Sequence, residues 1–133
     1  MPSRHEALAR SFIEAFNAGD TQRLIALSTP DIEVRPLRAV LEDVVYHGPA
    51  GIEQWRLDVR ESWSALALEP GEISDVSENR ILLTGTFHAR GRSTDAVTQV
   101  AVTFVADVRD DLVESVRTFL DPEEAARAAS ADS

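Results

Sequence analysis

Apolar residues recur at helical spacing in two parts of the first half of the chain. A capping box begins at Ser3, and the apolar positions after it predict a helix that ends at Gly19, where glycine adopts the left-handed conformation without strain. A second short helix is predicted over 21–28 and a third over 50–66. The third helix carries its apolar residues on one stripe, which consists of Ile52, Trp55, Val59, Trp63 and Leu66. Its charged residues, Arg56 included, are expected to be solvated.

Apolar and polar residues alternate in the rest of the chain, which predicts strands. Residues 32–35 predict one short strand, whereas 37–47 has no clear period and is interpreted as irregular chain or a further strand. The second half predicts four strands, near 67–77, 80–92, 95–109 and 112–121. A final short helix is predicted over 122–129. This order predicts an α+β fold in a single domain over 1–133, with 130–133 as a frayed tail.

The register of the last hairpin places one charged residue among apolar ones. If Asp110 and Asp111 form a two-residue loop, Arg117 lies opposite Phe104 on the apolar face of the sheet. An unpaired buried cation costs on the order of several kcal/mol, so Arg117 needs a partner there. The alternatives are a salt bridge to Glu33, a snorkelling side chain at the sheet rim, and a ligand-filled cavity.

Histidine and tryptophan residues each allow a functional and a structural interpretation. His47, beside Tyr46 and just before the third helix, is a candidate catalytic residue or a solvated loop residue. His88 falls on the polar face of the sheet and indicates a surface or a subunit interface. Trp55 and Trp63 are either core residues or the walls of a pocket. The three histidines are scattered along the chain, so no metal site is expected.

Composition excludes several classes of protein. The chain of 133 residues has no cysteine, which removes disulfides and thiolate chemistry. Its formal charge of −10 would repel nucleic acid and anionic membranes, so neither is an expected partner. No apolar run approaches the roughly 20 residues of a membrane span, and no signal segment is found, so a cytoplasmic protein is expected. All basic residues are arginine, which favours a GC-rich, bacterial genome. No phosphate loop is found, and no cofactor is expected.

Five short motifs occur in an order that points to a known superfamily. They are Phe16-Asn17-Ala18-Gly19-Asp20, Thr29-Pro30-Asp31-Ile32-Glu33, Tyr46-His47-Gly48-Pro49-Ala50-Gly51-Ile52, Arg109-Asp110-Asp111-Leu112-Val113 and Phe119-Leu120-Asp121-Pro122-Glu123-Glu124-Ala125. Together they resemble the nuclear transport factor 2-like superfamily, in its SnoaL-like branch of polyketide cyclase and ketosteroid isomerase-like proteins. The resemblance implies a cone: a curved antiparallel or mixed sheet wrapped around three to four helices, as in a cystatin-like α+β roll. It also implies a pocket and homodimers formed through the sheet.

The acidic residues of the characterised mechanisms in this branch have no counterparts in this chain. The position matching the general-base aspartate of ketosteroid isomerase-like proteins is Arg35, and the one matching the acid/base aspartate of SnoaL-like cyclases is Arg117. A guanidinium stays protonated near neutral pH and cannot act as a general base. Neither mechanism therefore transfers to this chain by resemblance.

The sequence leads to two hypotheses of function. The first is a cofactor-free pocket for a small apolar or polyketide-like molecule with an anionic or carbonyl group, with isomerase- or cyclase-type chemistry. Arg35 and Arg117 would supply fixed donors, and His47 or Glu33 would be the base. The expected ligand-binding residues are Phe12, Phe16, Tyr46, Trp55, Trp63 and Phe104. The second hypothesis is a non-catalytic ligand-binding or dimeric association module of the same fold.

One face of the predicted sheet is rich in small residues that form strands readily. Its members are Thr84, Thr86, Gln99, Ala101, Thr103, Val105 and Val116. Threonine, glutamine and small apolar residues suit a flat protein–protein contact better than they suit a solvated face. We therefore expect a two-fold homodimer through this face, against the alternative of a monomer.

Overall fold

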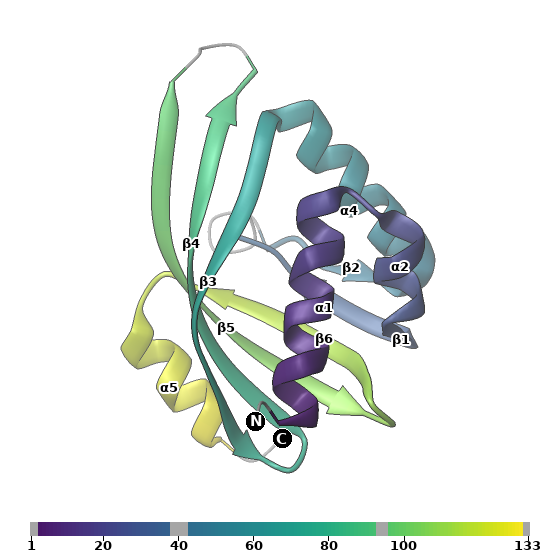
Figure 1. Cartoon of the computed structure of the whole chain (residues 1–133), viewed down its shortest axis with the longest axis vertical. Helices are drawn as coiled ribbons and strands as arrows, with labels where there is room; N and C mark the ends of the chain where they lie inside the picture. The colour runs from purple at the N-terminus through teal and green to yellow at the C-terminus, as the bar shows by residue number, and fades with distance from the viewer. Residues whose placement is uncertain (1–2, 38–42, 93–95, 132–133) are drawn as a thin grey trace.

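Four helices and six strands occur in the residues that the computed structural model describes, which are 3–37, 43–92 and 96–131. In chain order they are α1 (Arg4–Ala18), α2 (Thr21–Ala26), β1 (Ser28–Arg35), β2 (Tyr46–His47), α4 (Gly48–Ser62), β3 (Trp63–Ser77), β4 (Arg80–Gly91), β5 (Val97–Arg109), β6 (Leu112–Phe119) and α5 (Pro122–Ser130) (Figure 1). The single domain over 1–133 stays a prediction.

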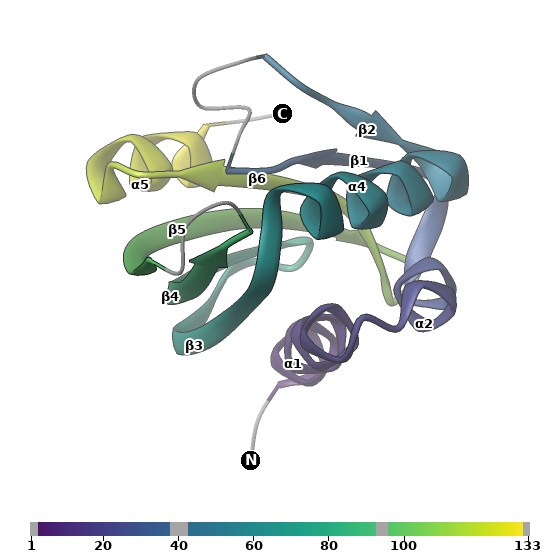
Figure 2. The same ribbon diagram turned by 90° about the horizontal axis from the view of Figure 1, so that it is seen from above.

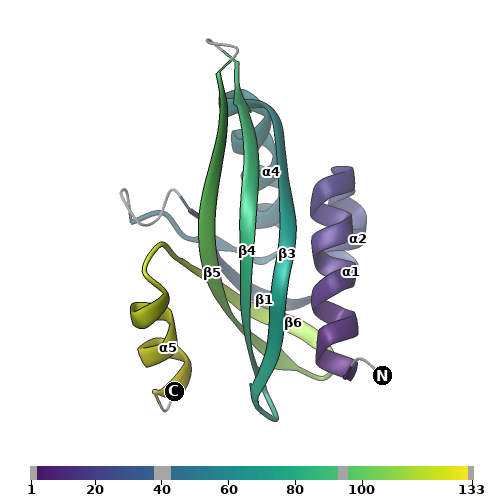
Figure 3. The ribbon, with the colours of Figure 1, turned by 60° about the vertical axis from the view of Figure 1, so that its left-hand side comes forward.

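The six strands form one mixed sheet in the order β2-β1-β6-β5-β4-β3. β1 and β6 run parallel, and every other neighbouring pair is antiparallel. The sheet is curved and unclosed, with α1, α2 and α4 on one side and α5 on the other (Figures 2 and 3). The α+β class and the curved sheet packed against helices are therefore confirmed.

Local capping explains where the first two helices begin and end. The Ser3 hydroxyl accepts a hydrogen bond from the Glu6 amide at 3.0 Å, and Gly19 ends α1 with φ +69°. Asp20 accepts from the Arg23 amide at 3.1 Å and so begins α2. Both predicted helix starts are confirmed, although α2 ends at Ala26, two residues early.

The third helix is shorter than its apolar stripe predicts. α4 ends at Ser62, and Trp63 begins β3 in register with Gly91 of β4. Trp63 and Leu66 therefore lie on a strand, because a continuous apolar stripe cannot by itself mark the change from helix to strand. Of the stretch 37–47, residues 38–42 lie outside the described residues, and the two-residue strand β2 pairs with β1 at Glu33 and Val34.

An asparagine side chain ties the first helix to the sheet. Asn17 donates from Nδ2 to the Leu68 carbonyl at 2.9 Å and accepts from the Leu68 amide at 2.8 Å. The side chain thus satisfies both backbone groups of a strand residue. This pair of bonds fixes the distance between α1 and β3, which form two walls of the cavity described below.

The last hairpin has the predicted turn but not the predicted register. Asp110 and Asp111 have φ of +54° and +63°, as a two-residue primed turn requires, and Arg109 pairs with Leu112. Val108 then pairs with Val113, but Asp107 pairs with Ser115. Glu114 is therefore the extra residue of a β-bulge, which reverses the faces of all later β6 residues.

The bulge corrects the placement of Arg117. Arg117 pairs with Val105, and it is Thr118 that pairs with Phe104. The predicted inward position of Arg117 is wrong. Phe104 also pairs with Leu83 of β4, on its other side. Burying an unpaired arginine among apolar residues is costly. The predicted inward position of Arg117 was therefore itself evidence of a register shift between the turn and Arg117.

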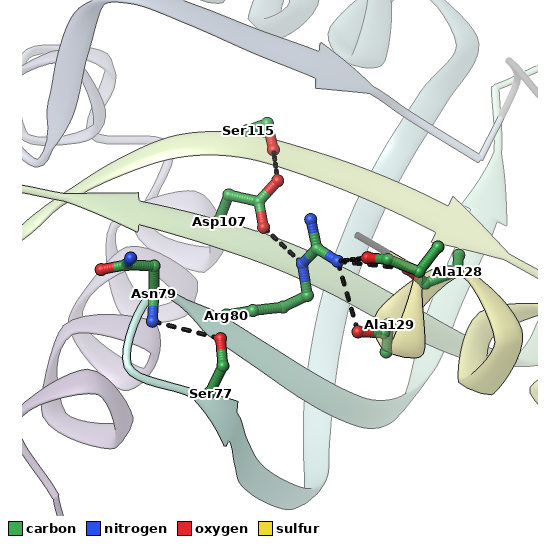
Figure 4. Close-up of polar contacts among 8 residues, drawn as sticks. Ser77, Asn79, Arg80, Asp107, Ser115, Ala128 and Ala129 are labelled. Carbon is green, nitrogen blue, oxygen red and sulfur yellow. Dashed lines mark hydrogen bonds and ion pairs between the residues drawn. The ribbon is translucent and has the colours of Figure 1, made fainter. Parts of the chain in front are cut away.

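The outer face of the sheet is partly covered by α5. Val105 is fully buried there against Ala125 and Ala129. Arg80 donates from Nε to Asp107 at 2.7 Å and from Nη1 to carbonyls at the end of α5 (Figure 4). Ser115 donates to the other oxygen of Asp107 at 2.9 Å.

This arrangement changes the surface from which a homodimer was predicted. Thr103 and Val105 are buried, and Val116 faces the inside of the cone. Thr84, Gln99 and Ala101 are exposed, so the part of the face beyond α5 remains accessible.

Candidate functional site

A cavity of about 380 Å³ lies between the inner face of the sheet and helices α1 and α4. Its walls are almost entirely apolar. The six residues predicted to bind a ligand, Phe12, Phe16, Tyr46, Trp55, Trp63 and Phe104, all line it. The structure therefore brings together side chains from two helices and three strands of the sheet, and their contact with a ligand stays a prediction.

Aromatic rings form a continuous wall from α4 to the sheet. The ring centroids of Phe16 and Trp55 are 5.2 Å apart at an interplanar angle of 31°. Phe16 also lies 6.3 Å from Phe87, which meets Phe104 edge-on at 5.9 Å. Such tilted and edge-on pairs are the favoured geometries of aromatic side chains. The wall offers a surface for a flat, apolar molecule.

A hydrogen-bonded pair, Tyr46 and Asp58, supplies polar groups at this otherwise apolar cavity. Tyr46 Oη donates to Asp58 Oδ2 at 2.5 Å, and Gln54 Nε2 donates to Asp58 Oδ1 at 2.8 Å. Tyr46 and Asp58 both line the cavity. Both oxygens of the carboxylate are thus fixed in position, which is the arrangement of an oriented acceptor or general base.

Helical spacing and one close approach place this pair. Trp55, Asp58 and Ser62 recur at spacings of three and four on α4 and share its cavity face. Gly51 lets the first turn of α4 approach β2, because a Cβ there would lie 2.9 Å from the Tyr46 carbonyl carbon. Asp58 was not among the residues predicted from the sequence. Its position three residues after Trp55, on the apolar stripe, was the signal available.

Arg35 and Arg117 do not line the cavity. They are register partners on the parallel strands β1 and β6, and they share the outer face of the sheet. Arg35 is half exposed, and its Nη1 lies 3.9 Å from Oδ1 of the fully exposed Asp43. The prediction that both guanidiniums converge on a ligand inside the pocket is therefore wrong, because the bulge at Glu114 turns Arg117 outward and Arg35 alternates with the inward Val34.

His47 and Glu33 also lie outside the cavity lining. They face each other across β2 and β1, with His47 Nδ1 3.7 Å from Glu33 Oε1, and both side chains are about half exposed. His47 is the residue before α4, and its side chain makes no capping bond. His88 contacts Glu69 at 3.0 Å on the outer face.

Arg56 is buried, against the prediction that it is solvated. Its guanidinium lies 4.9 Å from the centroid of the Phe16 ring. Among the described residues, its Nε and Nη1 atoms have no hydrogen-bond partner. Burial lowers the pKa of Arg56 from its ordinary value, and the neighbouring Arg60 lowers it further. Arg56 thus backs the aromatic wall without reaching the cavity.

Within the described residues, no three His, Cys, Asp or Glu side chains come together as a metal-binding group. In the same residues, no helix is long and apolar enough to span a bilayer.

Comparison with known proteins identifies the family of the chain. The SnoaL-like domain matches residues 9–116. The chain belongs to the SnoaL-like domain family. The predicted resemblance is thereby confirmed. No curated protein sequence matches the chain.

Solved structures repeat the same fold at low identity. A nuclear transport factor 2-like protein of unknown function from Burkholderia pseudomallei has 20% identity and a TM-score of 0.79 over 98% of this chain and 100% of its own. TerC, co-crystallized with polyporic acid, has 16% identity and a TM-score of 0.78 over 97% and 100%. A candidate polyketide cyclase from Xanthomonas campestris has 18% identity and a TM-score of 0.77 over 96% and 97%. These likenesses establish the shared fold.

Proposed function

We propose that this SnoaL-like protein binds a small, largely apolar molecule in the cavity between its sheet and helices α1 and α4. The observation that carries the proposal is the cavity itself, at about 380 Å³ with aromatic and aliphatic walls. Small-molecule sites in proteins have volumes of roughly 300–1,000 Å³ and are mostly apolar with a few placed polar groups. Tyr46 and Asp58 are those polar groups.

Packing energetics support a functional rather than an accidental cavity. Protein interiors are close-packed and leave few voids larger than a water molecule. A void lined by apolar side chains costs stability, because the side chains around it lose dispersion contacts. A SnoaL-like chain of 133 residues that keeps such a void open therefore uses it to bind a ligand. A polyketide-like ligand is the finer proposal, supported by the name of the Xanthomonas campestris relative in fold.

A second candidate function is acid–base catalysis of the isomerase or cyclase type at Asp58. The specific observation in its favour is that Tyr46 and Gln54 hold both carboxylate oxygens, at 2.5 and 2.8 Å, beside the cavity. A general base must be oriented within hydrogen-bond reach of the proton it removes. Asp58 takes this role in place of His47 and Glu33, which lie outside the cavity lining.

Native mass spectrometry on protein purified from its host tests the binding proposal. Ala106→Phe would place a ring inside the cavity, whereas Ala126→Phe adds the same ring to the exposed face of α5. We expect a bound molecule in the wild type and in the Ala126→Phe control but not in Ala106→Phe. Equal retention by both variants would place the ligand elsewhere and refute the proposal.

The second candidate is tested by extracting the bound molecules from wild type and from Asp58→Asn. If Asp58 is the base, the variant accumulates the substrate while the wild type holds the product. Chromatographic retention separates the two even where their masses are equal. The same molecule in both proteins would leave binding as the only function.

We also propose a two-fold homodimer through the exposed part of the outer sheet face. Thr84, Gln99 and Ala101 remain accessible there on the neighbouring strands β4 and β5, and uncharged side chains of this kind suit a protein–protein contact. Light scattering at micromolar concentration should give about twice the chain mass of 14.6 kDa. A mass near that of one chain would exclude the dimer. The cytoplasmic location and the absence of a nucleic-acid partner stay predictions from the sequence.

A further inference from the structure

We propose that the ligand is amphipathic: its apolar end fills a closed end of the cavity, and its polar end stays hydrated at a mouth beside Ser62 and Thr98. This inference rests on the proposed binding function, and it specifies the class of molecule and its orientation. The basis is the change in burial and polarity of the lining from one end of the cavity to the other.

The cavity reaches the surface where α4 ends and β5 begins. Among the described residues that line it, Ser62 and Thr98 are the two that are exposed. Ser62 is the last residue of α4, and Thr98 pairs with Ala89 near the end of β4. Trp63, the first residue of β3, follows Ser62 directly, is half-buried and also lines the cavity. Ser62, Trp63 and Thr98 form the mouth, and each has a side-chain group that can donate a hydrogen bond.

The opposite end of the cavity is closed and aliphatic. Ile81 and Leu83 at the start of β4, Ile13 of α1 and Val113 of β6 line it there, each with 8% or less of its surface exposed. From Ile81 to Ala89 the strand β4 extends about 27 Å, so the closed end and the mouth are well separated. The beginning of α1 and the end of α4 likewise lie at opposite ends of the molecule (Figure 1).

Polarity changes in the same direction as burial. Asp58 lies one helical turn before Ser62 on the cavity face of α4, which is about 6 Å along the helix. A ligand oxygen at the mouth therefore lies near side chains that form hydrogen bonds. An oxygen at the closed end would lie among the aliphatic side chains of Ile81, Leu83 and Val113.

This gradient determines which end of a molecule enters first. Removing apolar surface from water is favourable, whereas a hydroxyl among aliphatic side chains loses its hydrogen bonds to water without a replacement. Ser62 and Thr98 are exposed, so a polar group beside them keeps its contact with water. The apolar part of the ligand contacts the walls, and a large hydrophilic group at the polar end extends into solvent.

Isothermal titration calorimetry with three probes that share an eight-carbon chain tests this orientation on the wild-type protein. 1-Octanol has one polar end, octyl β-glucoside carries a sugar at that same end, and 1,8-octanediol has a hydroxyl at each end. We expect the glucoside to bind as tightly as octanol, because its sugar remains in water. The diol should bind about tenfold more weakly than octanol, since one of its hydroxyls would be buried without a partner.

A charge added at the mouth locates the polar end independently. Thr98→Arg places a guanidinium there and should tighten the binding of octanoate about threefold. Val97→Arg is the matched control, because Val97 precedes Thr98 on β5, is 65% exposed and does not line the cavity. It should leave the affinity for octanoate unchanged. The affinity for 1-octanol, which has no charge, should stay the same in both variants.

The outcomes separate this inference from the function beneath it. If octanol binds and the glucoside does not, the polar end is enclosed, and the inference is wrong while the cavity remains a binding site. The same conclusion follows if the diol binds as tightly as octanol, or if Thr98→Arg and Val97→Arg change octanoate binding equally. If octanol does not bind, or binds Ala106→Phe as tightly as the wild type, the proposed binding function fails and the inference fails with it.

Discussion

Arg80 and Arg56 are equally buried, each with 8% of its surface exposed, yet they lie in opposite environments. Arg80 lies on the outer face of the sheet, where its Nε bonds Asp107 at 2.7 Å and its Nη1 bonds the Ala131 carbonyl at 2.7 Å. Arg56 lies in the helical layer and has the Phe16 ring at 4.9 Å. The burial of a charged side chain does not by itself determine its contribution to the stability of the fold. That contribution depends on the hydrogen-bond partners around the side chain.

The difference has a structural origin. Arg80 meets the carbonyl end of α5, where the last groups of a helix lack intrahelical partners and accept from a cation. Arg56 lies against the end of α1, since its Nη2 would be 3.3 Å from a Cβ at Gly19, and α1 has no basic residue in its last turn. Arg56 therefore gains from the helix dipole and from Phe16, but two of its nitrogens remain unsatisfied among the described residues.

Breaking the satisfied site should have the largest effect. Arg80→Met leaves the carboxylate of Asp107 with Ser115 alone and removes the bonds to the end of α5. We expect a loss of about 3–5 kcal/mol in the free energy of unfolding, measured by urea denaturation. Arg4→Met is the control, because its pair with Asp111 is exposed and should contribute nothing measurable. Equal effects of the two substitutions would refute this view of Arg80.

A smaller loss is expected at the edge of the cavity. Tyr46→Phe keeps the ring and removes one hydrogen bond from Asp58, which retains the bond from Gln54. The free energy of unfolding should fall by about 1–2 kcal/mol, measured in the same urea experiment. A loss as large as that of Arg80→Met would mean that this pair is primarily a structural element.

Arg56→Met should not cause the loss of stability that is expected for Arg80→Met. Replacing a buried, poorly satisfied charge by an apolar side chain of similar shape is often neutral or stabilising. We expect the free energy of unfolding to stay unchanged or to rise by about 1 kcal/mol. A loss above 2 kcal/mol, by contrast, would show that the contact with Phe16 outweighs the unsatisfied nitrogens.

The smallest effect concerns an exposed pair and its dependence on pH. The hydrogen bond from Arg109 lowers the pKa of Asp31 below its ordinary value of 3.8. A carboxyl with a lowered pKa stabilises the fold above its unfolded pKa, and this contribution is lost as pH falls below 3.8 through the folded value. Asp31→Asn should therefore flatten the change in urea midpoint between pH 5 and pH 2. An unchanged slope would show that Asp31 contributes nothing to acid unfolding.

Local signals were enough to predict much of the fold. The caps at Ser3 and Asp20 and the turn at Asp110 depend on neighbours within a few residues, so their physics can be read from the chain. The aromatic residues of the cavity were also predictable, because large apolar side chains must turn inward in so small a domain. The resemblance to the SnoaL-like family was inferred from the order of such local motifs, and the family match over residues 9–116 confirms it.

The polar half of the site was decided by tertiary structure. Asp58 and Tyr46 meet only because α4 packs on β2, which no local period encodes. The bulge at Glu114 exchanged Arg117 for Thr118 at the cavity, since a one-residue shift reverses every later side chain of a strand. Burial of Arg80 and Arg56 likewise depended on where α5 and α1 end in space. The sequence by itself determined which residues would be apolar walls, because hydrophobicity is a property of single residues. Which charged side chains face the cavity was decided by the packing of distant elements. A buried charge is stable only where groups from those elements can pair with it.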